Sequence, residues 1–190
     1  MRASLLACGL TALLLTGAAV PTDAATTPKQ KFTLTSPDIK PGAMIADQFT
    51  ANSFGCTGAN TSPALSWSVA PEGTKSFVLT VYDPDAPTGS GFWHWVMYNI
   101  PASVTSLPEG AGVVGKEPAG ATQNVTDFGV PGYGGPCPPK GDKPHRYVFT
   151  VYAVKAEKLE VPANPTAAVV GFVTHFATIG KASFTAKYAR

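Results

Sequence analysis

Three stretches of the sequence have the pattern of β-strands, in which successive side chains point to opposite faces, and each stretch is mainly apolar on both of these faces. They are SFVLTVYD (76–83), HWVMYNIP (94–101) and HRYVFTVYAV (145–154). Strands that are apolar on both faces are typical of the centre of a sheet that is covered on both sides. The three stretches therefore predict central β-strands, and Gly/Pro-rich segments such as DPDAPTGS and LPEGAG predict the turns between strands.

The alternation also assigns the side chains of these strands to faces. We expect one shared face in each stretch: Phe77, Leu79 and Val81 in the first; His94, Val96, Tyr98 and Ile100 in the second; His145, Tyr147, Phe149, Val151 and Ala153 in the third.

Shorter strands are predicted at 31–36, 65–68 and 183–188, and one helix is predicted late in the chain. Asn164 can cap this helix, Pro165 suits its first turn and Gly180 can end it. An apolar stripe at helical spacing is expected to be buried and consists of Val169, Phe172, Val173, Phe176 and Ile179. His175 lies off this stripe and is expected at the surface. The whole pattern predicts a mainly β, single-domain, β-sandwich-like fold with a late α-helix packed on it.

The N-terminus has the features of a secretory signal peptide. Arg2 is followed by an apolar run from Leu5 to Leu15, and small residues precede a possible cleavage site after Ala24. The alternative is a lipoprotein signal ending at Cys8, which would leave almost no apolar segment. We therefore predict a signal peptide over 1–24, a folded domain over 25–190, and a secreted or periplasmic location.

Charge and hydropathy exclude some partners of the mature chain. The net charge is +2, and no cluster of Lys and Arg stands out, which argues against binding to nucleic acid. No second apolar segment reaches the roughly 18 residues of a membrane helix. We expect a soluble protein without a membrane span.

Two cysteines remain after the signal peptide, Cys56 and Cys137. An even pair in an oxidising compartment favours a disulfide between them. Two free thiols or half of a metal site are the alternatives, but neither cysteine has Cys-x-x-Cys or Cys/His spacing.

Polar side chains mark the ends of the predicted central strands. Asp83 ends the first stretch, and Pro84 and Pro87 restrict the backbone around Asp85. His94 and His145 each begin a stretch, and Tyr147 shares a face with His145. If these ends converge, imidazoles and a phenol hydroxyl would suit an anion, and two histidines with an aspartate could instead bind zinc. A third interpretation is that the histidines are structural and DPDAP is only a turn.

The loop GYGGPCPPKGDKP (132–144) precedes the third strand. Its glycines allow close approach of the backbone and its prolines restrict it, as expected for the rigid wall of a binding site. The alternative is an edge loop whose prolines only prevent further strand pairing.

Taken in order, DPDAP (83–87), HWVMYNIP (94–101) and GYGGPCPPKGDKPHRYVFTVYAV (132–154) resemble the signature blocks of the phosphatidylethanolamine-binding protein family, in particular its bacterial, Raf-kinase-inhibitor-like branch. The resemblance extends through CTGANTSPALSW (56–67) to the terminal YAR (188–190). It implies a β-sandwich-like fold with a small anion pocket at one end. It also supports the Cys56–Cys137 disulfide.

The resemblance implies which residues form the pocket: Asp83, Asp85, His94, His145 and Tyr147, with Cys137, Pro138 and Pro139 as one wall. Family members bind phosphate, phospholipid head groups or carboxylates there and need no metal or other cofactor. We therefore expect an exported binding protein for a small anionic ligand or phospholipid head group. The alternative is an inhibitor of a partner protein, such as a protease.

An enzyme is the third class of function, and the sequence argues against it. No G-x-S-x-G turn is present, and Cys137 is expected to be in a disulfide. A metallohydrolase built on His94, His145 and Asp83 lacks the histidine spacing of a zinc-binding helix.

Overall fold

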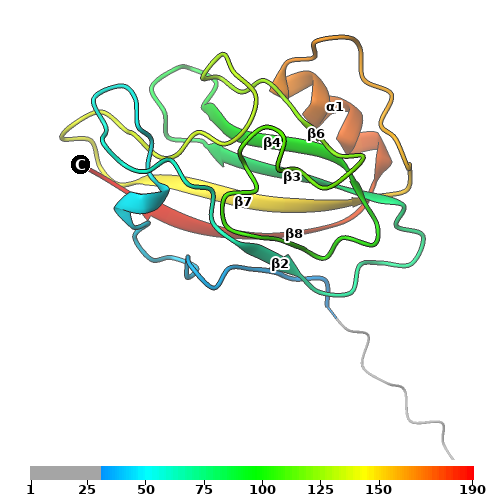
Figure 1. Cartoon of the computed structure of the whole chain (residues 1–190). Coiled ribbons are helices and arrows are strands. Elements are labelled where there is room, and N and C mark those ends of the chain that lie inside the picture. The colour runs from blue at the N-terminus through cyan, green and yellow to red at the C-terminus, as the bar shows by residue number, and fades with distance from the viewer. Residues whose placement is uncertain (1–30) are drawn as a thin grey trace, which may run out of the picture.

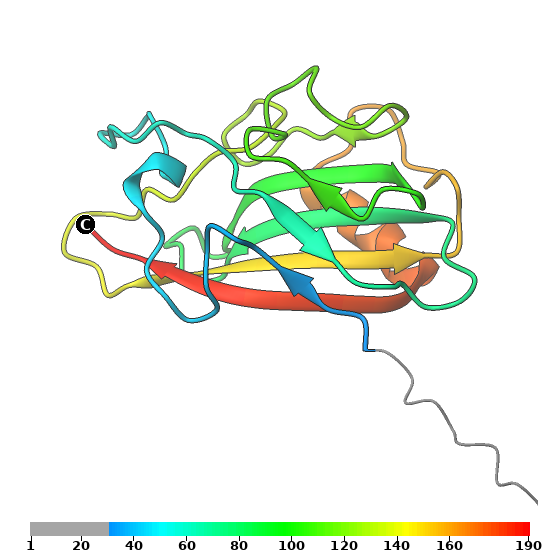
Figure 2. The same ribbon diagram turned by 60° about the horizontal axis from the view of Figure 1, so that its bottom comes forward.

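The computed structural model describes residues 31–190, in which two antiparallel sheets pack face to face (Figures 1 and 2). The smaller sheet has the strand order β1-β2-β5 and the larger sheet β6-β4-β3-β7-β8. The elements are β1 (Leu34–Thr35), the 3₁₀ helix η1 (Asp47–Phe49), β2 (Leu65–Trp67), β3 (Ser76–Asp83), β4 (Phe92–Pro101), β5 (Ser106–Leu107), β6 (Thr122–Gln123), β7 (His145–Val154), α1 (Ala167–Ala177) and β8 (Thr178–Tyr188). The predicted mainly β fold is confirmed. The predicted signal peptide lies outside the described residues.

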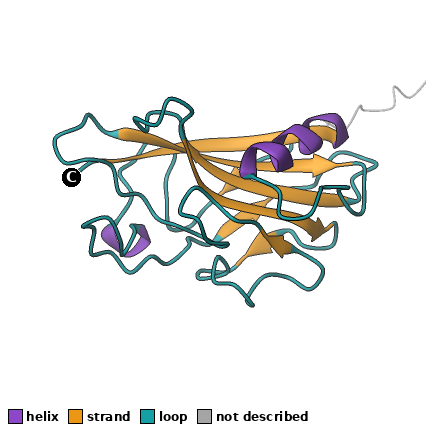
Figure 3. Cartoon of the chain, turned by 90° about the horizontal axis from the view of Figure 1, so that it is seen from above, coloured by secondary structure: helices purple, strands orange, loops and turns teal. Residues whose placement is uncertain are grey.

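Both faces of the larger sheet are covered, which explains why its central strands are apolar on both sides. Phe77 and Leu79 of β3 face the smaller sheet and pack with Leu65 and Trp67. Val78 faces the other way, toward α1, and Figure 3 shows α1 lying against this face of the sheet. β3 pairs with β4 on one side and with β7 on the other, so the three predicted central strands are neighbours.

The predicted facing of β4 is wrong at two positions, because two irregularities interrupt the alternation. Near Asn99, Phe77 and Leu79 of β3 pair with Ile100 and Met97 of β4, so β4 has one extra residue in this interval. Asn99 has a φ of 56°, and Ile100 turns to the side of Trp95 and away from that of Val96. The second irregularity is at His94 and is described with the site. β-bulges of this kind place consecutive side chains on unexpected faces.

The helix is present, but its predicted boundaries and buried face are wrong. Thr166 caps it in place of Asn164, through a bond from Val169 N, and it ends at Ala177, where β8 begins. The residues that it buries are Ala167, Val170, Thr174 and Ala177. These smaller side chains let the helix approach the sheet closely.

The large apolar residues of the predicted stripe lie mainly on the other side of α1. Phe172 and Phe176 are 66% and 64% exposed, and their rings contact each other with a centroid distance of 5.0 Å. His175 is exposed, as predicted.

Two loops and the C-terminus gather at one end of the larger sheet (Figures 1 and 2). The loops comprise residues 50–60 and 132–144. Most of the second loop's first half, from Gly132 to Pro136, is buried. This end of the sheet is where β3 finishes and β7 begins, so the loops cover the ends of the central strands.

Candidate functional site

A cavity of about 190 Å³ opens at this end of the larger sheet. Its polar lining consists of Asp83, Thr88, His94, His145 and Tyr147. The remaining lining residues are apolar or aromatic, or belong to the disulfide: Phe54, Ala86, Pro87, Phe92, Phe128, Cys137, Pro138 and Pro139. A mainly apolar cavity with a few convergent polar groups is the usual form of a small-molecule site.

Asp83 and His145 form a buried pair at the base of the cavity. Asp83 Oδ2 lies 2.7 Å from His145 Nδ1, and both side chains are almost fully buried. Asp83 Oδ1 accepts a further hydrogen bond from Asp85 N at 2.8 Å. The turn after β3 therefore fixes the carboxylate, and the carboxylate in turn fixes the orientation of the His145 ring.

Asp85 lies outside this cavity. Its carboxylate accepts hydrogen bonds from Nε and Nη2 of Arg146 at 2.9 and 2.7 Å, and Oδ2 also accepts from Arg146 N. The hydrogen bond from the Arg146 side chain is the main cause that lowers the pKa of Asp85 to about 2. Of the two carboxylates in DPDAP, Asp83 contacts His145 within the cavity, whereas Asp85 shares a separate surface depression with His145.

His94 enters the cavity through a β-bulge. Val81 pairs with Trp95, and the next residue of β3, Tyr82, pairs with Trp93, so that His94 is the extra residue of β4. Strict alternation would place His94 on the helix side with Val96. The bulge turns its ring toward Tyr147, with ring centroids 5.1 Å apart. β-bulges often redirect a side chain beside a functional site in this way.

The ring of His94 is held from behind by the glycine-rich loop. His94 Nδ1 lies 2.8 Å from the carbonyl oxygen of Gly134, and a carbonyl only accepts, so Nδ1 carries a proton. Burial lowers the pKa of His94 below its usual value. The neutral ring then has an unprotonated Nε2, which makes no hydrogen bond within residues 31–190.

Tyr147 contributes a buried hydroxyl without a partner. The residue is fully buried, and its hydroxyl makes no hydrogen bond to any residue that the structure describes. Burial, with a further contribution from the Asp83 carboxylate, raises the pKa of Tyr147. Its hydroxyl is therefore a neutral O–H group. It lacks the hydrogen bond that a buried polar atom normally has.

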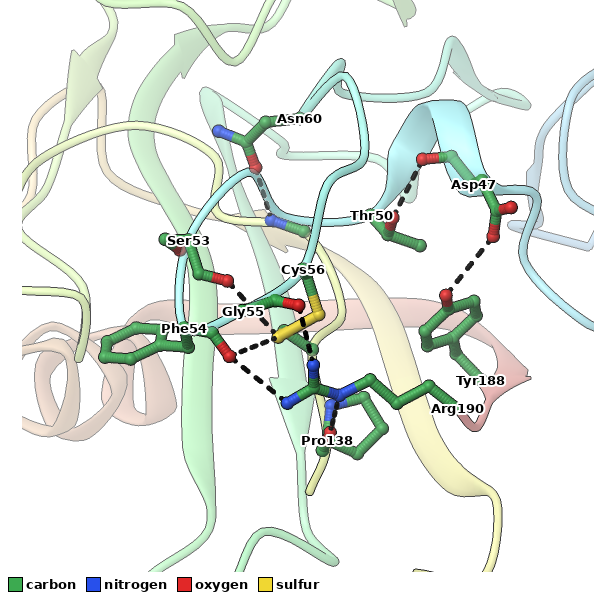
Figure 4. Close-up of a disulfide and its surroundings, with 12 residues drawn as sticks. Asp47, Thr50, Ser53, Phe54, Gly55, Cys56, Asn60, Pro138, Tyr188 and Arg190 are labelled. Atoms are coloured by element: carbon green, nitrogen blue, oxygen red, sulfur yellow. Dashed lines mark hydrogen bonds between the residues drawn. A yellow bond between two sulfur atoms is a disulfide. The ribbon is translucent and has the colours of Figure 1, made fainter. Parts of the chain in front are cut away.

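The predicted disulfide is present and joins the two loops that enclose the cavity (Figure 4). Cys56 and Cys137 are bonded. Arg190, the last residue, makes a second connection: its guanidinium donates to the carbonyl oxygens of Pro138, Gly55 and Phe54 at 2.6, 3.0 and 3.2 Å. Pro138 and Pro139 have no N–H, so this wall offers the cavity shape and apolar surface.

Glycines bring the second loop close to the first. A Cβ on Gly135 would lie 2.2 Å from the carbonyl oxygen of Phe49, and a Cβ on Gly134 would lie 2.2 Å from the ring of Phe128. Gly135 N also donates to Asn60 Oδ1 at 2.8 Å. The glycines of GYGGP are therefore required by close packing against other parts of the protein, whereas from the sequence we related them to the wall of a binding site.

Some lining residues were not predicted from the sequence. Phe54 and Phe128 lie in loops without periodicity, and Phe92 lies two residues before His94, where no pattern marked its ring as part of the cavity. The rings of Phe92 and Phe128 pack with centroids 4.9 Å apart, and Phe128 also contacts His94 at 5.3 Å. Arg190 gave one indirect signal, because it belongs to the terminal YAR that resembles the family.

The described residues contain no group of three or more His, Cys, Asp or Glu side chains arranged to hold a metal ion. Across the same residues, no helix has the length and apolar character needed to cross a bilayer.

Comparison with known proteins agrees with this fold and with the sequence blocks. Residues 35–189 match the sequence profile of the phosphatidylethanolamine-binding protein family. YbcL of Escherichia coli is 54% identical over 159 residues, covering 83% of this chain and 87% of YbcL. YbhB of the same organism is 48% identical over 158 residues, covering 82% of this chain and 99% of YbhB.

The chain is also similar to a solved structure and to a relative named as a putative lipoprotein. A crystal structure of E. coli YbcL, described as a new member of the mammalian PEBP family, has a TM-score of 0.82 and 52% identity, and covers 85% of this chain and 99% of that one. A putative lipoprotein of Mycobacterium tuberculosis, LppC, is 38% identical over 147 residues, which is 75% of this chain and 66% of LppC. The chain belongs to the phosphatidylethanolamine-binding protein family.

Proposed function

We propose that this protein is an exported binding protein whose cavity takes a small anionic group: a phosphate, a phospholipid head group or a carboxylate. The observation that carries the proposal concerns Tyr147: the residue lines the cavity, and its buried hydroxyl has no hydrogen-bond partner among residues 31–190. An anion oxygen is a strong acceptor for such a donor, and the bond would be short and charge-assisted.

The histidines support the same ligand chemistry. His145 donates through Nδ1 to Asp83, and its Nε2 lies 3.4 Å from Asp142 Oδ2. This second contact is at the long limit of a hydrogen bond and its carboxylate is partly exposed, so an anion that approaches Nε2 would replace it. Nε2 of neutral His94 can accept a hydrogen bond from a protonated oxygen, or become protonated beside an anion. Asp83 has its two oxygens engaged by His145 and Asp85 N, which reduces its repulsion of a bound anion.

Binding without turnover is the second part of the proposal. Cys137 lines the cavity, but its sulfur is bonded to Cys56 and is not a free nucleophile. Among residues 31–190, Thr88 supplies the only Ser or Thr hydroxyl in the lining, and it donates to the carbonyl oxygen of Gly91. Phosphoethanolamine incubated with the protein should therefore be recovered unchanged, as ³¹P NMR would show.

An extracytoplasmic location is the third part. The Cys56–Cys137 disulfide fits an oxidising compartment, and LppC, a relative, is named as a putative lipoprotein. Fractionation of the native host, with the mature N-terminus determined by mass spectrometry, would test cleavage after Ala24.

The test of anion binding uses the imidazole NMR signals during titration with phosphate or phosphoethanolamine. His94 and His145 should shift together with one Kd, because both line the cavity. His175 is exposed on α1 and serves as an internal control whose signals should not move. No shift of either cavity histidine at millimolar ligand would overturn the proposal.

Asp85→Asn is a matched control variant for this titration. The carboxylate of Asp85 binds Arg146 outside the cavity, so the Kd for phosphate should stay within about twofold, as expected for a largely exposed ion pair. A large loss of affinity would place Asp85 in the site after all.

A further inference from the structure

A second cavity, of about 250 Å³, adjoins the first. The two cavities share Phe54 and Phe128 in their linings. We propose that the second cavity is a subsite for a neutral, hydroxylated substituent of the bound anion, so that the full ligand is a phosphate ester of a polyol. This inference rests on the proposed anion site and adds the chemical class of the group attached to the anion.

The shared aromatic wall makes the two cavities parts of one site. The rings of Phe54 and Phe128 lie with centroids 5.8 Å apart, and Phe128 also contacts the ring of His94. Gly134 lines the second cavity, while its carbonyl oxygen holds His94 in the first. A group attached to an anion in the first cavity can therefore extend across these two rings into the second.

The second cavity differs from the first in charge. Its lining includes aromatic and aliphatic side chains, such as Phe54 and Val130, together with amides and hydroxyls. The part of the chain that the structure describes contributes no Asp, Glu, Lys, Arg or His to it. An ammonium group placed there would leave water without a carboxylate to replace its solvation, which is unfavourable. The second cavity therefore favours a neutral polar group over the ammonium of ethanolamine.

Two polar side chains of this lining are free to bind hydroxyl groups. Asn60 is engaged at both ends of its amide, by Tyr133 O and Gly135 N, and Thr126 donates to Val130 O. The side chains of Asn52 and Ser53 line the same cavity and make no hydrogen bond to other residues in 31–190. Both belong to the loop of residues 50–60 that the disulfide holds, and Figure 4 shows Ser53 beside Phe54 in it. Together they offer donors and acceptors that match hydroxyls.

The test compares three probes at pH 8, where both esters are dianions: inorganic phosphate, methyl phosphate and sn-glycerol 3-phosphate. We expect glycerol 3-phosphate to bind about tenfold more tightly than methyl phosphate, the gain that two neutral hydrogen bonds typically provide. Its titration should also shift the amide signals of Thr126 and Gly132, which line only the second cavity.

The double variant Asn52→Ala, Ser53→Ala should remove this tenfold preference and leave the Kd for phosphate unchanged. Both residues are exposed, so the fold should tolerate their loss. Thr57→Ala is the matched control: Thr57 is an exposed residue of the same loop but lines a different surface depression, and its loss should leave the preference intact.

The possible failures are distinguishable. If phosphate binds but glycerol 3-phosphate and methyl phosphate bind equally well, or if the double variant keeps the preference, the polyol subsite is wrong and the anion site stands. If none of the three probes binds, the proposed function fails and the subsite fails with it.

Discussion

The cavity is built from two kinds of structure that are held in different ways. β3, β4 and β7 supply Asp83, His94, His145 and Tyr147, and each of these strands is paired on both sides within the larger sheet. The loops of residues 50–60 and 132–144 supply one part of the apolar walls, formed by Phe54, Pro138 and Pro139. They have few backbone bonds to each other, such as Ala51 N to Pro136 O. The loops depend on a disulfide, on one arginine and on glycine contacts. Single substitutions should therefore affect the loops far more selectively than the strands.

Removing the disulfide should produce the largest effect. The bond joins residues 81 positions apart, and the double variant Cys56→Ser, Cys137→Ser should lower the free energy of unfolding by about 4 kcal/mol. Urea denaturation measures this loss. A loss below about 1 kcal/mol would contradict the role of the bridge.

Hydrogen exchange of the same double variant tests the comparison itself. Amides of β3 and β7 should stay protected, whereas those of the 132–139 segment should exchange faster. Equal loss of protection in strands and loop would show that the two regions are not held separately.

Gly135→Ala should have the next largest effect. The added Cβ would lie 2.2 Å from Phe49 O and 2.5 Å from the carbonyl carbon of Thr50. Because backbone atoms cannot move aside cheaply, we expect a loss of about 2 to 3 kcal/mol in thermal or urea unfolding.

Gly171→Ala is the matched control for this glycine. A Cβ at Gly171 meets nothing within 4 Å, and the residue lies inside α1, so alanine should raise stability by about 0.5 to 1 kcal/mol. If both variants had the same sign of effect, close packing would not explain Gly135.

Arg190→Ala should lower stability by about 1.5 to 2 kcal/mol, since it removes charge-assisted donors from the carbonyl oxygens of Phe54, Gly55 and Pro138. Arg190→Lys should recover only part of this, because an ammonium group cannot span the same acceptors. Combining Arg190→Ala with the cysteine variant should give a loss that is not additive, since both act on the same two loops. Strict additivity would contradict that shared role.

His94 should make stability depend on pH with a defined sign. Its pKa is lowered in the folded state by burial, so below the usual value of 6.5 the unfolded chain binds a proton that the folded chain does not. Stability should therefore fall as the pH drops below about 6.5, by at most about 1.4 kcal/mol per pH unit from this group.

The control for this pH effect is His94→Gln, which keeps a donor for Gly134 O. The difference in stability between wild type and variant should change between pH 7 and pH 5, with wild type losing more. A constant difference would show that His94 is not a buried neutral group.

The contrast between strands and loops also explains what could be predicted from the sequence. The predicted ranges 76–83 and 145–154 are the observed bounds of β3 and β7. These strands could be predicted because eight to ten consecutive residues contribute to the same pattern. The facing of His94 and Ile100 could not be predicted, since a bulge depends on how two strands pair and leaves no mark in one strand's alternation.

Helix α1 shows a different limit. Both Val169/Phe172/Phe176 and Ala167/Val170/Thr174/Ala177 have helical spacing, and hydrophobicity favours the first set. The sheet selects the second set because it accepts small side chains at close approach. Phe54 could not be predicted as part of the cavity end, and the contacts of Arg190 could not be predicted from the terminal YAR, since both depend on which loops meet.

Tyr147→Phe tests the central claim most directly, because it removes one oxygen and leaves the packing of the ring unchanged. The hydroxyl has no partner among the described residues, so its removal should leave stability unchanged or slightly higher. The Kd for phosphate, measured by calorimetry or NMR, should rise about tenfold through loss of the donor to the anion. A variant that loses stability and binds phosphate with unchanged Kd would contradict the account.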